Sequence, residues 1–309
     1  MREFIEEISN LKNIKQRDLI EKDILIQKIL LELSKDEFFL KNLAFKGGTC
    51  LIKCYLGYYR FSEDIDLTWI DQTIFREMSQ KEIRKTISDL KDKIGKLLIE
   101  ISKDKKMDFI LDKNNRKYLE FGGGNKTITF KLWYDSEILK HPSFIKIQIN
   151  FVENIKFNIS KKKIKNLLND TSNKNFVSFY GTDYTDYVED AFLYTYDTKE
   201  ILCEKARAIL TRRGIKARDF VDIYLINKTF GIKIQDLKNE IVEKTTFILN
   251  LYEKYRSNFR EKIKLLNSDD FFRWGTEQEL LLKDIDEKQF NRFVKELQDF
   301  LKDVGKEIG

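Results

Sequence analysis

The chain has 309 residues, of which 42% are hydrophobic and 35% are charged, and its formal net charge is +6. This length and this store of large apolar side chains suit two modest folded domains and argue against intrinsic disorder. Three scattered cysteines exclude a disulfide framework, and the single histidine, His141, excludes a histidine-ligated metal site. The charged N-terminus and the lack of a long apolar run predict a cytoplasmic protein with no membrane segment.

The first elements lead to a turn that contains two glycines. Residues 2–35 show helical spacing of apolar side chains, and residues 43–45 predict a short buried strand. The sequence Lys46-Gly47-Gly48-Thr49 follows, and a helix is expected from Thr49 to about residue 55. Because glycine has no Cβ, backbone amides in this turn can approach a phosphate group closely.

The next strand carries a pair of acids. Alternation over residues 64–69 places Asp64 and Asp66 on one face, a few ångströms apart. Adjacent carboxylates repel each other unless a cation lies between them, and oxygen ligands suit magnesium, which completes its shell with water and nucleotide phosphates. Manganese remains an alternative. Upstream, Arg60 and Ser62 either anchor the glycine turn or contact phosphate.

A long helix and a second group of strands come next. Residues 77–103 predict an amphipathic helix, and residues 107–135 are rich in β-forming residues. The three glycines at 122–124 favour a hairpin turn over a second phosphate loop, because alternating strands flank them on both sides. Residues 143–151 alternate cleanly and predict a further strand of the same site.

Two sequence blocks resemble a known family. The first is Lys-Gly-Gly-Thr at 46–49 followed by Arg-Phe-Ser-Glu-Asp-Ile-Asp-Leu at 60–67, and the second comprises residues 204–213 and 216–224. Together, roughly 140 residues apart, they resemble the nucleotidyltransferase superfamily and most of all its AbiEii branch. These are nucleotidyltransferase-like toxins of abortive-infection and toxin–antitoxin systems.

The resemblance implies an α+β fold. Residues 1–190 would form a nucleotidyltransferase catalytic domain, a mixed β-sheet with flanking helices. Residues 191–309 would form a helical bundle that completes the nucleotide site. The local sequence agrees, since a short β segment near 192–196 precedes Asp197 and Thr198, which suit the cap of a helix that runs to about Arg212. Beyond residue 230 the pattern indicates amphipathic helices that serve as scaffold or partner surface.

One expected acid is missing. The superfamily often has a third carboxylate on the strand at 143–151, facing the aspartate pair, but here Gln148 or Asn150 takes its place. Glu153 has the wrong parity for a regular strand, although a β-bulge could redirect it. Either amide or water ligands complete the metal shell, or the protein binds nucleotide without turning it over.

The second block supplies further candidates. Lys205 and Arg212 are seven residues apart on one helical face, and the resemblance implies that they contact the β- and γ-phosphates; a surface lysine is the alternative. On the next helix, Arg218, Asp219 and Asp222 form a narrow polar stripe. They could form a buried salt bridge, or one acid, Asp219 first, could deprotonate the acceptor or orient Lys205 and Arg218.

The resemblance therefore implies a magnesium-dependent toxin that transfers a nucleoside monophosphate from an NTP to an acceptor hydroxyl. Lys46, Gly47, Gly48 and Thr49 would hold the triphosphate, and the candidate acceptor is RNA, such as the 3′ end of a tRNA. A cognate antitoxin protein is expected. Basic clusters at 103–106, 161–163 and 212–218 fit an RNA path or an ordinary solvated surface. The rival functions are a phosphotransferase acting on a protein or small molecule and a catalytically decayed nucleotide-binding module.

Overall fold

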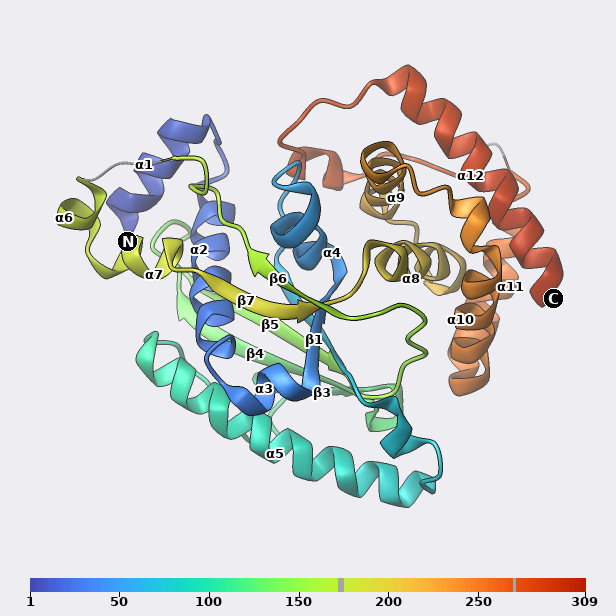
Figure 1. Ribbon diagram of the computed structural model, residues 1–309, viewed down its shortest axis with the longest axis horizontal. Helices are drawn as coiled ribbons and strands as arrows, with labels where there is room; N and C mark the ends of the chain where they lie inside the picture. Colours follow the sequence, from blue (N-terminus) through green and yellow to red (C-terminus); the bar gives the residue numbers. More distant parts are fainter. Residues whose placement is uncertain (172–174, 269–270) are drawn as a thin grey trace. The chain divides into compact units, whose positions relative to one another are not determined.

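The computed structural model describes residues 1–171, 175–268 and 271–309 (Figure 1). The chain divides into two compact units, the first comprising Met1–Glu153 with Ile159–Tyr196 and the second Asn154–Asn158 with Asp197–Gly309. A mixed sheet with helices forms the first unit, and helices form the second. The predicted α+β fold class is confirmed.

The described residues of the first unit contain one seven-stranded sheet with the order β3-β4-β5-β2-β1-β7-β6. The pairs β2–β5 and β1–β7 are parallel, and the other neighbours are antiparallel. The strands are β1 (Leu43–Lys46), β2 (Asp64–Trp69), β3 (Leu119–Gly122), β4 (Thr127–Asp135), β5 (Pro142–Asn150), β6 (Ser160–Ile164) and β7 (Ala191–Thr195). The strands predicted at 43–45, 64–69, 143–151 and 192–196 are thus present to within a residue or two.

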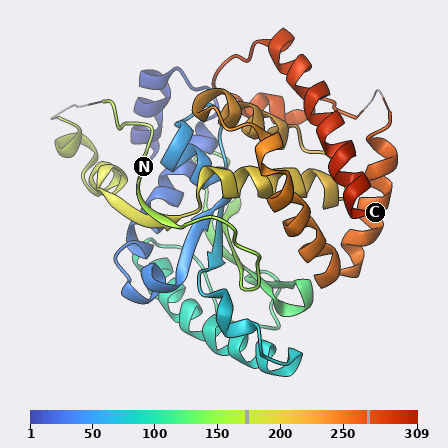
Figure 2. The same ribbon diagram turned by 45° about the vertical axis from the view of Figure 1, so that its right-hand side comes forward.

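Helices of the first unit pack beside this sheet, and α5 runs along one side of it in both ribbon views (Figures 1 and 2). The described helices of this unit are α1 (Arg2–Lys12), α2 (Arg17–Leu33), α3 (Glu37–Asn42), α4 (Gly47–Cys50), the π-helix η1 (Leu51–Leu56), the 3₁₀ turns η2 (Gln72–Phe75) and η3 (Gly123–Asn125), α5 (Gln80–Asp104), α6 (Phe176–Tyr180) and α7 (Thr182–Val188). A capping box formed by Ser79 and Glu82 begins α5.

Three local predictions can be refined. The stretch 2–35 is two helices, because Asn13 adopts a left-handed backbone, with φ of 52°, and ends α1. The helix expected from Thr49 begins two residues earlier, at Gly47, and continues as a π-helix. The three-glycine segment is the predicted hairpin turn, since Gly122 pairs with Thr127 across antiparallel strands.

The second unit is built from helices, the first of which begins at a side-chain cap. The side chain of Asp197 accepts a hydrogen bond from Lys199 N at 2.8 Å and so begins α8, as predicted. The described elements are α8 (Thr198–Thr211), α9 (Ala217–Phe230), η4 (Ile234–Leu237), α10 (Lys238–Leu251), α11 (Glu253–Leu265), η5 (Thr276–Leu280) and α12 (Glu287–Ile308).

A buried ion pair joins the segment Asn154–Asn158 to this helical unit. Glu200 and Lys244 pair with both side chains fully buried. The Glu200 carboxylate also accepts hydrogen bonds from Lys156 N and Phe157 N, each at 2.8 Å, and Lys244 Nζ donates to Asn154 O at 2.6 Å. The segment that follows β5 is therefore held by two charged side chains that are far from it in the sequence.

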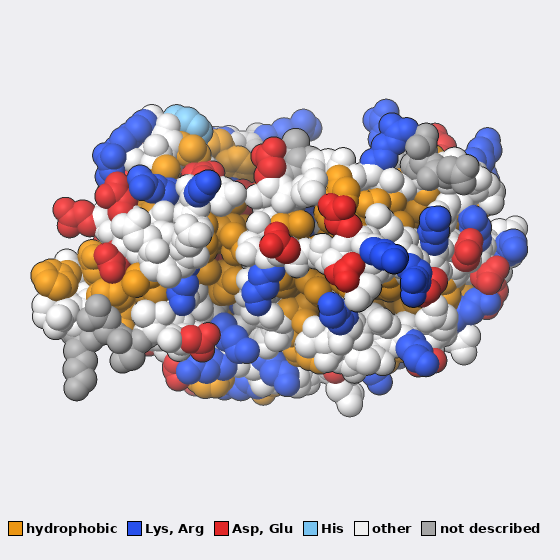
Figure 3. Space-filling model, turned by 90° about the horizontal axis from the view of Figure 1, so that it is seen from above, with side chains coloured by type: hydrophobic (Ala, Val, Ile, Leu, Met, Phe, Trp, Pro, Cys, Tyr) orange, Lys and Arg blue, Asp and Glu red, His pale blue; other side chains and the backbone are white. Residues whose placement is uncertain are grey.

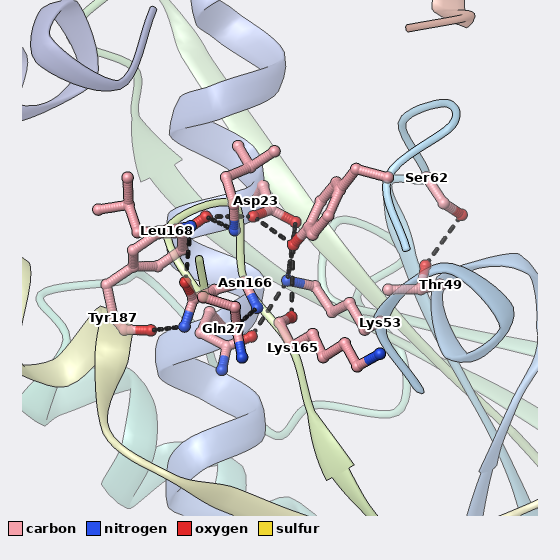
Figure 4. A network of polar contacts seen from close by, with 12 residues as sticks. Asp23, Gln27, Thr49, Lys53, Ser62, Lys165, Asn166, Leu168 and Tyr187 are labelled. Carbon is pink, nitrogen blue, oxygen red and sulfur yellow. Dashed lines mark hydrogen bonds and ion pairs between the residues drawn. The ribbon is translucent and has the colours of Figure 1, made fainter. Parts of the chain in front are cut away.

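A second buried network supports the helix that follows the glycine turn (Figure 4). Lys53 Nζ lies 2.8 Å from Asp23 Oδ1 on α2 and donates to Tyr58 OH at 2.7 Å. Tyr187 OH donates to the same aspartate at 2.8 Å. Burial lowers the pKa of Lys53, and the charge of Asp23 opposes that shift. The network links α2, η1 and α7 in the first unit.

None of the described helices combines the length and apolar composition that a membrane span requires. On the face shown in Figure 3, Lys and Arg side chains are interspersed with Asp and Glu.

The buried network gives a stability prediction. Lys53→Met should lower the free energy of unfolding by about 3–5 kcal/mol, because it leaves the Asp23 carboxylate buried without its cation. Lys302→Met, which removes the partner of the exposed Asp299, should cost less than about 1 kcal/mol. Urea unfolding measures both; equal losses would contradict a special role for the buried pair.

Candidate active site

The antiparallel register of β1 and β2 places the glycine turn against the aspartate pair. Lys46, the last residue of β1, lies opposite Asp66 on β2. Gly47 comes next, with φ of +76°, and a Cβ on it would lie 2.4 Å from Asp66 Oδ2. Both the left-handed backbone and the close approach require glycine at this position.

The rest of the turn packs against the loop that precedes β2. A Cβ on Gly48 would lie 2.6 Å from Arg60 Nη2 and 3.1 Å from Ser62 Oγ. The Thr49 hydroxyl lies 2.9 Å from Ser62 Oγ (Figure 4) and also donates to Asp64 O at 2.5 Å. Arg60 is 1% exposed, and its Nη1 donates to Phe61 O at 2.7 Å. The structure thus brings together the predicted residues of the 46–49 and 60–66 blocks.

The two aspartates share one face of the sheet, as the alternation predicted. Ile65 and Leu67 are fully buried on the other face, whereas the Asp64 side chain is 37% exposed. On the neighbouring strand β5, Lys146 lies opposite Asp64 and Gln148 lies opposite Asp66. Lys146 Nζ is 3.7 Å from Asp64 Oδ2. Lys146 was not predicted as a residue of the site, although it lies two positions before Gln148 and therefore on the same face of the strand.

Glu153 is placed by a loop and not by a β-bulge in the strand. Strand β5 ends at Asn150, and the Glu153 backbone N–H donates to Gln72 Oε1 at 2.8 Å. Its side chain is 1% exposed, and Oε2 lies 3.7 Å from Lys46 Nζ. Lys46 also lies over the ring of the buried Tyr196, 5.4 Å from its centroid. The third acid therefore reaches the lysine of the glycine turn, and Gln148 remains opposite Asp66.

Two carboxylates on one half-exposed face suit a cation that takes its remaining ligands from water and phosphate. Among the residues that the structure describes, no group of three or more His, Cys, Asp or Glu could hold a metal ion. Magnesium commonly binds through one or two carboxylates plus substrate phosphates, so Asp64 and Asp66 fit such an ion when a nucleotide is present.

Four of the predicted residues of the second block meet within the helical unit. Lys205 Nζ, on α8, lies 2.8 Å from Asp219 Oδ1 and 2.7 Å from Asp222 Oδ2 on α9. Arg212 Nη1 lies 2.9 Å from Asp219 Oδ2, and the Arg212 side chain is 45% exposed. Burial raises the pKa of Asp219, but the charges of Lys205 and Arg212 outweigh burial and lower the pKa below its ordinary value.

The lowered pKa of Asp219 gives a pH prediction. Its ion pairs stabilise the fold above the pKa of an unfolded aspartate, about 3.9, and that stability is lost as the pH falls through the lower folded value. Asp219→Asn should therefore be less stable than the wild type at pH 6, and the difference should narrow toward pH 3. Urea unfolding at several pH values measures this, with Asp299→Asn as the exposed control. A difference that does not change with pH would contradict the prediction.

The match to a family model agrees with the resemblance seen in the sequence. The model of the family described as nucleotidyl transferase AbiEii toxin, type IV toxin–antitoxin system, matches residues 28–306. JHP933 from Helicobacter pylori is 15% identical, with a TM-score of 0.41 and 94% of each chain covered. A candidate nucleotidyltransferase from H. pylori is 14% identical, with a TM-score of 0.43, 94% of this chain and 98% of that chain covered. No curated protein matches. Since the family model spans most of its length, the chain belongs to the AbiEii family of nucleotidyltransferase toxins of type IV toxin–antitoxin systems.

Proposed function

We propose that this toxin is a magnesium-dependent enzyme that transfers a nucleoside monophosphate from an NTP to a hydroxyl of RNA. The 3′ end of a tRNA is the first acceptor to test. The observation that carries the proposal is the close approach of the glycine turn to the aspartate pair, 2.4 Å between a Cβ on Gly47 and Asp66 Oδ2. A triphosphate bound by the turn would lie beside both carboxylates.

The residues of the glycine turn and of β2, together with Arg60 and Ser62, have proposed roles. Backbone amides of Gly47 and Gly48, with Thr49 and Lys46, would bind phosphate oxygens. The contacts of Arg60 and Ser62 with the turn support an anchoring role for both. Asp64 and Asp66 would hold the magnesium ion, or manganese in its place, and the ion would offset the negative charge of the triphosphate.

The reaction is an in-line displacement. The acceptor hydroxyl oxygen forms a bond to the α-phosphorus, the bond from that phosphorus to the β-phosphate oxygen breaks, pyrophosphate leaves, and the hydroxyl proton is released. Lys46 is held by Glu153 and Tyr196, and so could keep its ammonium group fixed near the phosphates. Positioning of this kind needs no third carboxylate on β5.

For the helical unit we propose a role in phosphate binding. Arg212 is half-exposed, so its guanidinium could contact a phosphate while Asp219 orients it, and Arg218 is a second candidate. Lys205 is held by two buried acids, and this arrangement supports a positioning role for Asp219 and Asp222 over the removal of a proton. A phosphate contact by Lys205 itself would require one of these ion pairs to open.

The proposed cellular location of the reaction follows from its substrates. We place the reaction in the cytoplasm, where NTPs and tRNA meet. Growth arrest would be the outcome of transfer, and a cognate antitoxin would counter it, as family membership implies.

The direct test incubates the purified full chain with magnesium, total cellular RNA and each α-labelled NTP in turn. Label in a discrete RNA band is the expected result. Label that reaches a protein or small molecule only from a γ-labelled NTP would replace the proposal by a phosphotransferase. Nucleotide binding with no transfer of either label would favour a binding module.

The aspartate pair gives a prediction for activity. Asp64→Asn and Asp66→Asn should each reduce transfer at least about a hundredfold and abolish growth arrest on expression, because the site loses a metal ligand. Asp89→Asn on the exposed side of α5 should leave both unchanged. Transfer rates and growth curves measure the effects, and full toxicity in Asp66→Asn would rule out the proposed role.

The glycine turn gives a second prediction with a matched control. Gly47 and Gly57 both have positive φ, +76° and +73°, but only a Cβ on Gly47 meets another atom within 4 Å. Gly47→Ala and Gly57→Ala should each lose about 1–2 kcal/mol of stability through backbone strain. Only Gly47→Ala should also lose NTP binding, because its methyl group displaces Asp66. Calorimetric titration with NTP and magnesium compares them; equal affinities would contradict the proposed phosphate turn.

A further inference from the structure

The edge of the sheet carries basic and aromatic side chains side by side. Strands β6 and β7 form an antiparallel ribbon at this edge, which we call the edge ribbon (residues 160–164 and 191–195). Lys161 lies opposite Tyr194, and Lys163 lies opposite Phe192. Both lysines are exposed, Phe192 is 41% exposed and Tyr194 is 38% exposed. The two cross-strand pairs thus share one solvent-facing surface.

Register places this surface on the same side of the sheet as the aspartate pair. Thr195 of β7 lies opposite Phe45 of the parallel strand β1, and both are buried on the other side. Side chains alternate along a strand, so Tyr194 and Phe192 share a face with Lys46, and Lys46 lies opposite Asp66. Strands β7 and β2 are separated only by β1, so these two strands lie about 10 Å apart across the sheet.

Protection of an exposed edge strand explains only the lysines. Natural sheets use charged residues on edge strands to block pairing with a second chain, and three consecutive lysines on β6 do this. The two exposed aromatic rings next to them need a different explanation. Flat rings beside cations are the combination that binds single-stranded nucleic acid, since bases stack on the rings and the cations contact phosphates.

We propose that the edge ribbon binds the single-stranded segment of RNA that precedes the acceptor hydroxyl. Phe192 and Tyr194 stack with bases, and Lys161 and Lys163 contact phosphates. This inference rests on the proposed transfer to RNA and adds where the acceptor lies.

The positive charge of this surface favours RNA over a second copy of the chain as its partner. A second copy of the chain would bring its own three lysines against these three, which disfavours self-association through β6. Asp190 adjoins the surface: it lies 2.6 Å from Lys163 Nζ, and both side chains are about half-exposed, so a phosphate could replace it at little cost. Lys162 lies on the opposite face, 5.7 Å from the ring centroid of Tyr55, and takes no part.

The test measures binding of a fluorescent 12-nucleotide single-stranded RNA to the full chain without NTP, at several salt concentrations. Phe192→Leu with Tyr194→Leu removes the rings and keeps apolar side chains on β7. Phe179→Leu, at a 72% exposed ring on α6, is the control. Lys161→Gln with Lys163→Gln removes two charges, and Lys81→Gln with Lys85→Gln on α5 removes two exposed charges elsewhere.

We expect the aromatic double variant to bind at least about tenfold more weakly with an unchanged salt slope. The lysine double variant should reduce the magnitude of the slope of log K against log salt by about 1.4, since each phosphate contact on a single strand contributes about 0.7. Neither control should change binding.

Failure of the inference is separable from failure of the proposed function. Ribbon variants that bind RNA as the wild type does, while the wild type labels RNA from an α-labelled NTP, would overturn the inference and leave transfer intact. A wild type that does not bind RNA would also overturn it and point to an acidic protein on this surface. RNA binding that depends on the ribbon, with no labelled RNA, would support RNA binding by the ribbon and contradict the transfer.

Discussion

Gly47 lies so close to the carboxylate of Asp66 that a Cβ at position 47 would be 2.4 Å from Asp66 Oδ2, and a larger residue there would displace that side chain. This approach follows from the antiparallel pairing of β1 and β2, which aligns Lys46 with Asp66 and brings the next residue into a left-handed turn. The alternation of β2 then fixes Asp64 on the same face, and parallel pairing with β5 brings Lys146 and Gln148 beside the two acids. The glycine turn and the aspartate pair, which we propose bind phosphate and a cation, are therefore adjacent because one strand pair aligns them.

The charged side chains near the face that carries Asp64 and Asp66 form separate groups. The third acid, Glu153, pairs with Lys46 at the end of the turn, so the aspartate pair faces an amide and a lysine on β5. Buried pairs elsewhere support the frame: Lys53 with Asp23 behind the turn, and Glu200 with Lys244 in the helical unit. Removing one partner of such a pair strongly destabilises the fold, because the remaining charge is left buried and uncompensated. We propose that Asp64 and Asp66 bind a cation that arrives with its nucleotide.

Local patterns predicted the parts of the fold that depend on neighbouring residues. The alternation of residues 64–69 and 143–151 predicted β2 and β5, the three glycines predicted the hairpin, and Asp197 predicted the start of α8. The break at Asn13 was missed because no glycine or proline marks it. The pairing of Glu153 with Lys46 and the attachment of residues 154–158 to Glu200 were missed because both join residues far apart in sequence. For the candidate site, the sequence predicted the residues of the turn and the acids, but their spacing could not show which acid meets which cation.

A crystal structure of the full chain with manganese and a non-hydrolysable NTP tests the central claim most directly, because anomalous scattering locates manganese without ambiguity. The account predicts a manganese ion bound by Asp64 and Asp66, with the triphosphate on the backbone amides of Gly47 and Gly48. A triphosphate bound elsewhere, or a metal ion that does not contact the two aspartates, would contradict it.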